Sequence, residues 1–247
     1  MLHYLMIAGP PFDIGLWAAV EQRIGSQGHT TQTLAMFIDG DGSLNHETDR
    51  IAHAIESAQN PVVLIAHGAA IPAAIEASRK HAPSGFVVSN GPISSIDRFT
   101  RGLIQWASLP SGVTEKLISP TLAMSILSSS IGLRRLVVNP YVMDHDTTVT
   151  VCGPIFEDKA RLGRMRRFIK DLTEHTWPAP PRNVQMLFCR GDSDPLTICN
   201  YDTLRPSLAQ GSMRDPVPGG RYLHPIERPW ELADRSMNWA DKNLTTT

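Results

Sequence analysis

Residues 61–75, PVVLIAHGAAIPAAI, start with a hydrophobic run, turn at His67-Gly68-Ala69 and continue as an alanine-rich helical pattern. The run at 62–67 is rich in β-branched residues, which predicts a strand buried on both faces. A sharp turn from strand to helix often presents a reactive side chain at its tip. The tip residue here is Gly68, which has no side chain. The stretch therefore predicts a buried sheet and a site that lacks the usual reactive atom.

The same order of strand and helix continues on both sides of this stretch. Hydrophobic runs predict strands at residues 2–9, 29–37, 86–90 and 184–189, and amphipathic patterns predict helices at 16–28, 46–58, 71–82 and 228–244. Such alternation implies parallel strands joined by right-handed crossovers. The predicted fold class is α/β, a mostly parallel sheet with helices on both faces.

Residues 93–180 interrupt the alternation with a stretch rich in Ser, Leu, Met and Pro. Because plain connections are short, a long insertion between late strands is usually functional. We expect residues 1–92 and 181–247 to form the core and residues 93–180 to form a helical lid over the carboxyl ends of the strands. Within this segment, RLGRMRRFIKDL at 161–172 predicts an amphipathic helix whose arginines face solvent.

Composition bounds the class of protein. The 247 residues are 42% hydrophobic with a net charge of −1, which suits one globular domain and predicts no nucleic-acid or membrane-surface partner. Cys152, Cys189 and Cys199 lack metal-site spacing and are interpreted as reduced thiols of a cytoplasmic protein. The apolar N-terminus predicts a first strand instead of a signal peptide. No phosphate loop or dinucleotide fingerprint occurs, so no cofactor is expected. The oligomeric state is left open, with a homodimer as one option.

Four motifs in order carry a family resemblance: AGPPFDIGLW at 8–17, AHGAA at 66–70, RGDSDP at 190–195 and GGRYLHPIERPWEL at 219–232. Their order and the predicted elements resemble the α/β-hydrolase superfamily over nearly the whole chain. The resemblance implies a ligand pocket at the carboxyl ends of the strands. It also implies a set of catalytic positions, several of which hold other residues here.

The nucleophile and one oxyanion donor are missing from these positions. The family elbow reads G-x-S-x-G, and Gly68 stands where its serine would be. Either the enzyme has lost its activity by drift, or the missing side chain makes room for a substrate or a water. The resemblance places Pro10 at an oxyanion-hole position, and proline has no N–H to donate. The N–H of Ala69 would remain to hold a substrate oxygen.

The acid and base positions are only partly filled. Asp194 stands at the family acid, although a surface turn would also favour its motif. Counting from the two glycines places Arg221 at the family histidine, and counting back from Glu227 places Tyr222 there. His224 follows two or three residues later. Whether His224 reaches Asp194 is left open.

Other candidates border the expected pocket. His67 precedes the tip, and the resemblance implies a packing role for it. Trp17 is interpreted as core or pocket wall, and Tyr141 as a substrate-binding residue of the lid. The run 144–146, Asp-His-Asp, could contact substrate or a metal, but a solvated turn is favoured and no metal site is predicted.

We therefore expect a cofactor-free enzyme that acts without a covalent intermediate on a hydrophobic small organic molecule. Acid–base chemistry by His224 with Asp194 would promote an elimination, a cyclisation or an isomerisation. The resemblance offers natural-product biosynthesis as one setting for such an enzyme. Tyr222 or Arg221 would assist as hydrogen-bond donors. Two alternatives remain: a non-catalytic ligand-binding or scaffold protein, and a hydrolase that uses direct attack by water.

Overall fold

The computed structural model describes residues 1–109, 119–175, 177, 179–197 and 201–244. Cys199 lies outside the described residues. Within them, six strands form one parallel sheet in the order β2-β1-β3-β4-β5-β6. The strands are β1 (His3–Ala8), β2 (Thr30–Leu34), β3 (Val62–His67), β4 (Gly85–Val88), β5 (Met186–Phe188) and β6 (Met213–Arg214).

The predicted fold class is confirmed. β3 is buried along its whole length, as its unbroken hydrophobic run predicts, and it lies between β1 and β4. The register pairs Ala8 with His67 and Ala66 with Val88, so these strands end at one edge of the sheet. The short strand β6 was not predicted. Its two residues are exposed and show no hydrophobic pattern.

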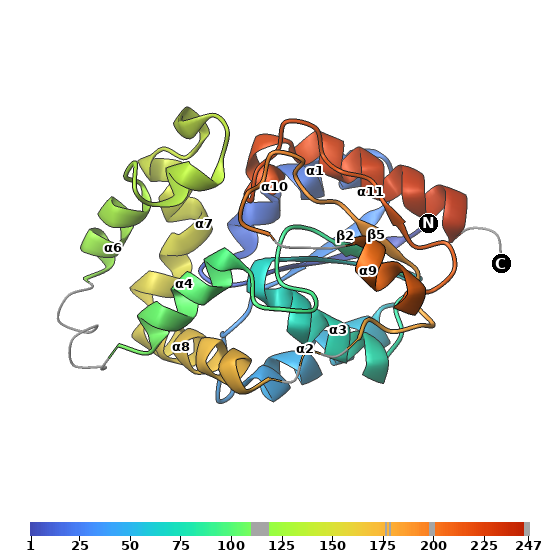
Figure 1. Cartoon of the computed structure of the whole chain (residues 1–247), viewed down its shortest axis with the longest axis horizontal. Helices are drawn as coiled ribbons and strands as arrows, with labels where there is room; N and C mark the ends of the chain where they lie inside the picture. Colours follow the sequence, from blue (N-terminus) through green and yellow to red (C-terminus); the bar gives the residue numbers. More distant parts are fainter. Residues whose placement is uncertain (110–118, 176, 178, 198–200, 245–247) are drawn as a thin grey trace.

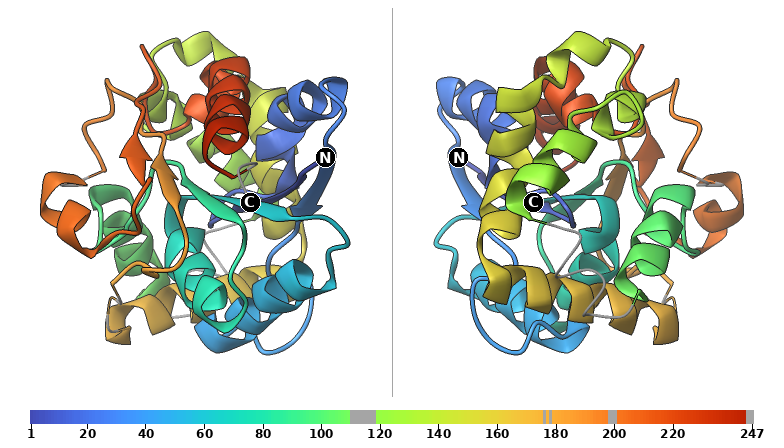
Figure 2. Two further views of the ribbon diagram at one scale, coloured as in Figure 1. Left: turned by 90° about the vertical axis from the view of Figure 1, so that its right-hand side faces the viewer. Right: turned by 90° about the vertical axis from the view of Figure 1, so that its left-hand side faces the viewer.

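Four helices cover the two faces of the sheet. Figure 2 shows α1 (Ala18–Ser26) and α11 (Pro229–Asn243) on one face and α2 (Leu44–Ser57) and α3 (Ile71–Lys80) on the other. Each presents an apolar stripe to the sheet, and the stripe is what buries the core. The shorter turns are η1 (Ile14–Trp17), η2 (Gly68–Ala70), η3 (Leu133–Leu136), η4 (Pro140–Val142), α9 (Tyr201–Leu204), η5 (Arg205–Ser207) and α10 (His224–Glu227).

The segment 93–180 is helical where it is described. Its helices are α4 (Arg98–Ala107), α6 (Pro120–Leu127), α7 (His145–Glu157) and α8 (Lys159–Glu174), which lie together at one end of the molecule (Figure 1). The N–H of Asp13 donates to the Val151 carbonyl at 2.7 Å, so α7 packs on the loop that follows β1. The division of the chain into a core and a lid stays a prediction.

The arginines of α8 were expected to form a solvated face, and the structure corrects this for Arg161 and Arg164, while Arg167 is exposed. The guanidinium of Arg161 is buried and donates to both carboxylate oxygens of Asp13 at 2.9 and 3.0 Å and to the Met36 carbonyl at 2.9 Å. Arg164 donates to the carbonyls of Phe37 and Gly40. The loops after β1 and β2 offer oxygens with no partner in the sheet, and the five N–H donors of arginine satisfy them.

Candidate active site

The turn after β3 keeps the backbone of a nucleophile elbow without the nucleophile. Gly68 has a φ of 63°, in the left-handed region that glycine adopts without strain. Its N–H donates to the Asn90 carbonyl at 2.6 Å. A β-carbon placed on Gly68 would lie 3.3 Å from the hydroxyl oxygen of Tyr222, its nearest contact. The space that a serine side chain would occupy therefore faces the Tyr222 phenol.

Backbone from two other loops closes around this turn. A β-carbon on Gly9 would lie 2.5 Å from the Ala69 nitrogen, and one on Gly91 would lie 2.5 Å from the Gly68 carbonyl oxygen. Only glycine permits such close approaches. Pro10 follows Gly9 and is buried with Ala69, so both predicted residues do lie at the elbow.

Tyr222 is the side chain that stands over the elbow. It is fully buried, and its ring centroid lies 4.7 Å from that of Phe99 and 5.0 Å from that of His67. Burial raises the pKa of its phenol well above the usual value, and the negative charges of Asp97 and Asp194 add to the rise. Tyr222 is therefore neutral at physiological pH and can donate a hydrogen bond.

Asp97 is a site residue that the sequence analysis missed. It precedes α4, and its Oδ1 accepts the N–H of Thr100 at 2.6 Å as a helix cap, while its buried Oδ2 has no partner in the described residues. Burial raises the pKa of its carboxyl group to about 6, and the charge of Asp194 contributes to the rise. An Asp before a helical pattern is the usual signature of a cap. That signature does not reveal that the cap is buried beside a second carboxylate.

We name Asp97, Thr100, Asp194, Thr197 and Tyr222 the acid–phenol cluster. Its buried Asp97 Oδ2, Thr100 Oγ1, Thr197 Oγ1 and Tyr222 hydroxyl make no hydrogen bond of normal geometry with any described residue. The Thr100 hydroxyl nevertheless lowers the pKa of both Asp97 and Tyr222, so it lies close to both. Buried polar atoms are nearly always satisfied, by water or a ligand if not by protein. Several such atoms around one point mark the cluster as the candidate site.

The contact between His224 and Asp194 that the sequence left open is not formed. The Asp194 carboxylate accepts the N–H groups of Leu196 and Thr197 at 3.0 and 3.1 Å. His224 instead places its Nε2 3.0 Å from the Ser89 hydroxyl oxygen. A catalytic role for either residue stays a prediction, but the two do not act as a hydrogen-bonded pair in this structure.

Ser89 bridges two buried histidines. Its hydroxyl oxygen lies 3.0 Å from His67 Nδ1 as well as from His224 Nε2, and His224 Nδ1 lies 3.3 Å from the Arg221 carbonyl oxygen. Burial lowers the pKa of His67 well below its usual value and lowers that of His224 to about 4. Both rings are therefore neutral at physiological pH. Whether His67 only packs or also contacts substrate stays a prediction.

The remaining predicted residues fall in different places. Trp17 is fully buried, with its ring centroid 6.3 Å from that of His67. Arg221 donates to the Val137 carbonyl at 3.4 Å and lines an open cleft next to the cluster. Tyr141 is 86% exposed, so it does not reach the buried cluster. Asp144 accepts the N–H of Thr147 at 2.8 Å as an exposed helix cap.

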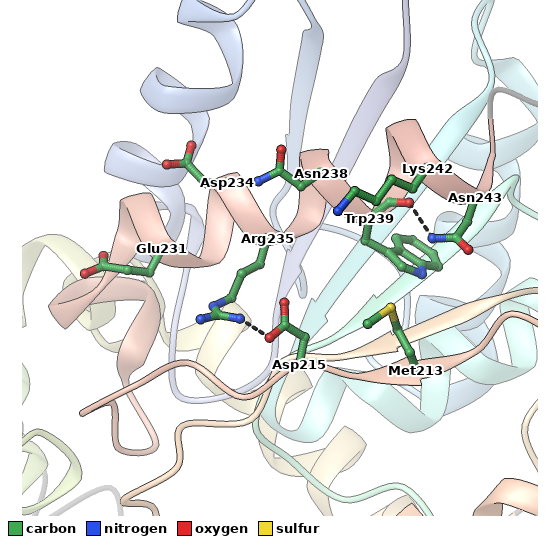
Figure 3. Close-up of a pocket in the computed structure, with 9 residues that line it drawn as sticks. All are labelled: Met213, Asp215, Glu231, Asp234, Arg235, Asn238, Trp239, Lys242 and Asn243. Carbon is green, nitrogen blue, oxygen red and sulfur yellow. Dashed lines mark hydrogen bonds and ion pairs between the residues drawn. The ribbon is translucent and has the colours of Figure 1, made fainter.

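A second cleft lies at the far edge of the sheet. Figure 3 shows it between β6 and α11, where Arg235 pairs with Asp215. Its volume is about 380 Å³. Another lining residue, Asp234, pairs with Arg23 at 2.8 Å. Because Asp215, Asp234 and Arg235 of this cleft pair within the protein and two strands separate it from β3, we place the candidate site at the acid–phenol cluster.

Two features, a membrane-spanning helix and a metal site, were looked for among the described residues. No described helix is long and apolar enough to cross a membrane. No three His, Cys, Asp or Glu side chains gather closely enough to hold a metal ion in the described part of the chain. The cluster therefore offers carboxyl, hydroxyl and phenol groups for proton transfer and hydrogen bonding.

A scan against models of protein families matches none, and a search of curated proteins finds no match. Solved structures do match along nearly the whole chain. An epoxide hydrolase, CorEH, is 10% identical with a TM-score of 0.76, covering 98% of this chain and 92% of its own. An alpha/beta hydrolase fold protein from Burkholderia ambifaria is 15% identical with a TM-score of 0.72, covering 95% and 89%.

A haloalkane dehalogenase, DbeA from Bradyrhizobium elkani, is 10% identical with a TM-score of 0.73, covering 99% of this chain and 91% of its own. At such identities the likeness shows the fold alone, and it carries no activity over to this chain. The parallel sheet, its strand order and these matches together establish that the chain has the α/β-hydrolase fold.

Proposed function

We propose that this protein is a cofactor-free enzyme that promotes proton transfer on a hydrophobic small organic molecule without a covalent intermediate. The observation that carries the proposal is the place of Tyr222, whose hydroxyl oxygen lies 3.3 Å from the position of a β-carbon on Gly68. A phenol that donates a hydrogen bond takes the place over the elbow where a hydrolase needs a proton acceptor.

Asp97 is the general base in this proposal. Its carboxyl group has a pKa of about 6 and a buried, unpartnered Oδ2, so it is ionised at neutral pH and ready to accept a proton. Tyr222 donates a hydrogen bond to the substrate oxygen that gains charge, and the Ala69 N–H is proposed to assist. Burial keeps the phenol protonated, and the charges of Asp97 and Asp194 add to this effect. We choose Asp97 as the base because its buried Oδ2 has no partner in the described residues, whereas His224 and Asp194 make no hydrogen bond with each other.

The reaction classes that need only these groups are elimination, cyclisation and isomerisation. Each moves a proton from carbon or oxygen while a nearby donor stabilises an enolate or alkoxide. None requires a serine, which agrees with glycine at the tip of the elbow.

A non-catalytic binding protein is the second candidate. It is favoured by the burial of Tyr222, which is fully enclosed in this structure. Hydrolysis by direct attack of water remains a third candidate, which the product of the reaction distinguishes.

The test is conversion of a natural compound. We would incubate the protein with an extract of the native host that lacks the gene, and follow the extract by mass spectrometry. Parallel samples contain Asp97→Asn, Tyr222→Phe and, as a control, Asp146→Asn, which removes an exposed carboxylate from α7. We expect conversion by wild type and the control. The two cluster variants should convert the compound at rates lower by a factor of about 10² or more.

The mass change identifies the reaction. No change indicates isomerisation or cyclisation, a loss indicates elimination, and a gain of water supports the hydrolase instead. Conversion that both cluster variants retain in full would place the chemistry elsewhere. A compound that co-purifies with all four proteins and is never converted would support the binding protein.

A further inference from the structure

An open cleft of about 570 Å³ lies next to the acid–phenol cluster. It is lined by residues of α4, of the end of α6 and η3, and of the loop after β5. Figure 1 labels α4 and α6. Its walls are mainly apolar and include Leu103, Leu127 and Leu136. Ile131 on its rim is 73% exposed. The volume is within the range of about 300–1,000 Å³ that small-molecule sites usually have.

Three arginines interrupt these apolar walls. Arg98 and Arg135 are exposed, and Arg221 is half-buried. None of the three forms an ion pair with a described residue. The buried Nε of Arg221 has no hydrogen-bond acceptor in the part of the chain that the structure describes. A cleft with three such cations and no lining carboxylate favours an anion.

The cleft and the cluster share a wall. Phe99 lines the cleft, and its ring lies against Tyr222 at 4.7 Å between centroids. Arg221 precedes Tyr222 in the chain. Leu196 lines the cleft and donates its N–H to Asp194 of the cluster. A molecule in the cleft would thus have one end near the arginines and another beside the ring that covers the phenol.

We propose that this cleft binds an amphipathic organic anion, with its apolar body against the leucines and a carboxylate or similar group against Arg98, Arg135 and Arg221. That this anion is the substrate rests on the proposed function. The binding itself requires no catalysis and can be measured separately.

The test compares matched anions and alcohols by calorimetry on the full chain. The probes are octanoate against octanol and phenylbutyrate against phenylbutanol. We expect at least one anion to bind more tightly than its alcohol, and to weaken as salt is added. The double variant Arg98→Gln with Arg135→Gln should bind that anion about tenfold more weakly, because two exposed charge contacts are lost. Arg101→Gln is the matched control, since Arg101 is an exposed arginine of α4 that does not line the cleft.

The inference is overturned if neither anion binds more tightly than its alcohol. It is equally overturned if the double variant and the Arg101→Gln control bind alike. The anion cleft and the proposed enzyme can each fail while the other stands. Arginine-dependent binding without any conversion of extract compounds would leave the anion cleft standing and refute the enzyme. Conversion that depends on Asp97, with neither anion bound more tightly than its alcohol, would leave the enzyme standing and refute the anion cleft.

Discussion

At the scale of single residues, Gly68 separates this protein from a serine hydrolase, and restoring the serine should not restore the chemistry. A serine at a φ of 63° carries a strain of about 1–2 kcal/mol, and its β-carbon would press on the Tyr222 hydroxyl at 3.3 Å. The group that faces it is a phenol with a raised pKa, which does not accept a proton. We expect Gly68→Ser to be less stable in urea by about 1–2 kcal/mol.

The same variant should stay unlabelled by a serine-directed phosphonate in mass spectrometry. Gly25→Ser is the control for stability, because Gly25 lies in α1 with open space around it. Its unfolding free energy should change by no more than about 0.5 kcal/mol. Stoichiometric labelling at residue 68 would show that an activating base does reach the elbow.

The ionised carboxylate of Asp97 should lower the free energy of unfolding at neutral pH. Its pKa is raised from 3.8 to about 6 in the folded protein, so the folded state holds the proton more tightly than the unfolded chain. The unfolding free energy should therefore fall as the pH rises from about 4 to about 6, and the loss should persist above that range. We expect Asp97→Asn, which keeps a capping side chain, to be more stable than wild type by about 2 kcal/mol at pH 7.

Asp144→Asn is the matched control for this effect. Asp144 caps α7 in the same way, but it is exposed, and its hydrogen bonds to Thr147 lower its pKa. The sign should therefore reverse, and the control should gain no stability at pH 7. Urea titrations of the three proteins at pH 4.5 and 7 would decide the matter. An Asp97→Asn variant that is less stable than wild type at pH 7 would contradict the raised pKa.

The pH dependence of activity follows from the same carboxyl group. If Asp97 is the base, the rate should rise with pH through about 6, as the carboxyl ionises, and then level off. His224 has a pKa of about 4, and the pKa of His67 is lowered well below its usual value. Neither histidine therefore accounts for a rise of the rate near pH 6. A rate that is flat between pH 5 and 7 would exclude Asp97 as the base.

At the scale of elements, the contacts that hold α8 to the core include, among the described residues, a buried ion pair and an exposed ion pair. Arg161 and Asp13 are both buried and joined by two hydrogen bonds, whereas Arg167 and Asp41 meet at 3.2 Å in solvent. Removing one partner of a buried pair leaves a charge without compensation, which costs about 3–5 kcal/mol. Removing one partner of an exposed pair costs about 1 kcal/mol at most.

We therefore expect Arg161→Met to lower the unfolding free energy by about 3 kcal/mol or more, and Arg167→Met to change it by no more than about 1 kcal/mol. Chemical denaturation measures both variants. The double variant Arg161→Met with Asp13→Asn should recover part of the loss, because the unpaired carboxylate is also removed. Equal losses in the two single variants would mean that the ion pair does not anchor α8.

The pattern of α8 shows what periodicity can and cannot predict. Apolar residues at helical spacing predicted a helix across 161–172, and the helix is there as part of Lys159–Glu174. The partners of its arginines are carbonyls of distant loops, such as those of Met36 and Gly40. An arginine that hydrogen-bonds a loop and one that faces water give the same local sequence. The interpretation as a solvated face was therefore wrong for Arg161 and Arg164, although Arg167 is exposed.

At the scale of the whole molecule, the order of elements was predictable and the site was not. Buried strands such as β3 show unbroken hydrophobic runs, and their alternation with helices restricts the topology to few choices. The cluster depends instead on the register of one loop, which puts Tyr222 over the elbow and His224 beside Ser89. It also depends on a helix cap, Asp97, that lies about a hundred residues from Asp194 in the chain. Neither the loop register nor the burial of a cap leaves a periodic signal.

The enclosed cluster implies that α4 must open for a molecule to enter. In α4 only Thr100 and Ala107 are buried and the apolar side chains pack on the core in part, whereas β3 is buried throughout. Local opening of α4 should therefore cost less free energy than opening of β3. We expect hydrogen exchange, followed by mass spectrometry, to label α4 well before β3. A saturating anion that binds in the cleft should slow exchange in α4, since Phe99 and Leu103 line the site. It should leave α11 unchanged, because no residue of α11 lines the cleft. Protection of α4 equal to that of β3, with no response to the anion, would mean that the molecule must enter by another path.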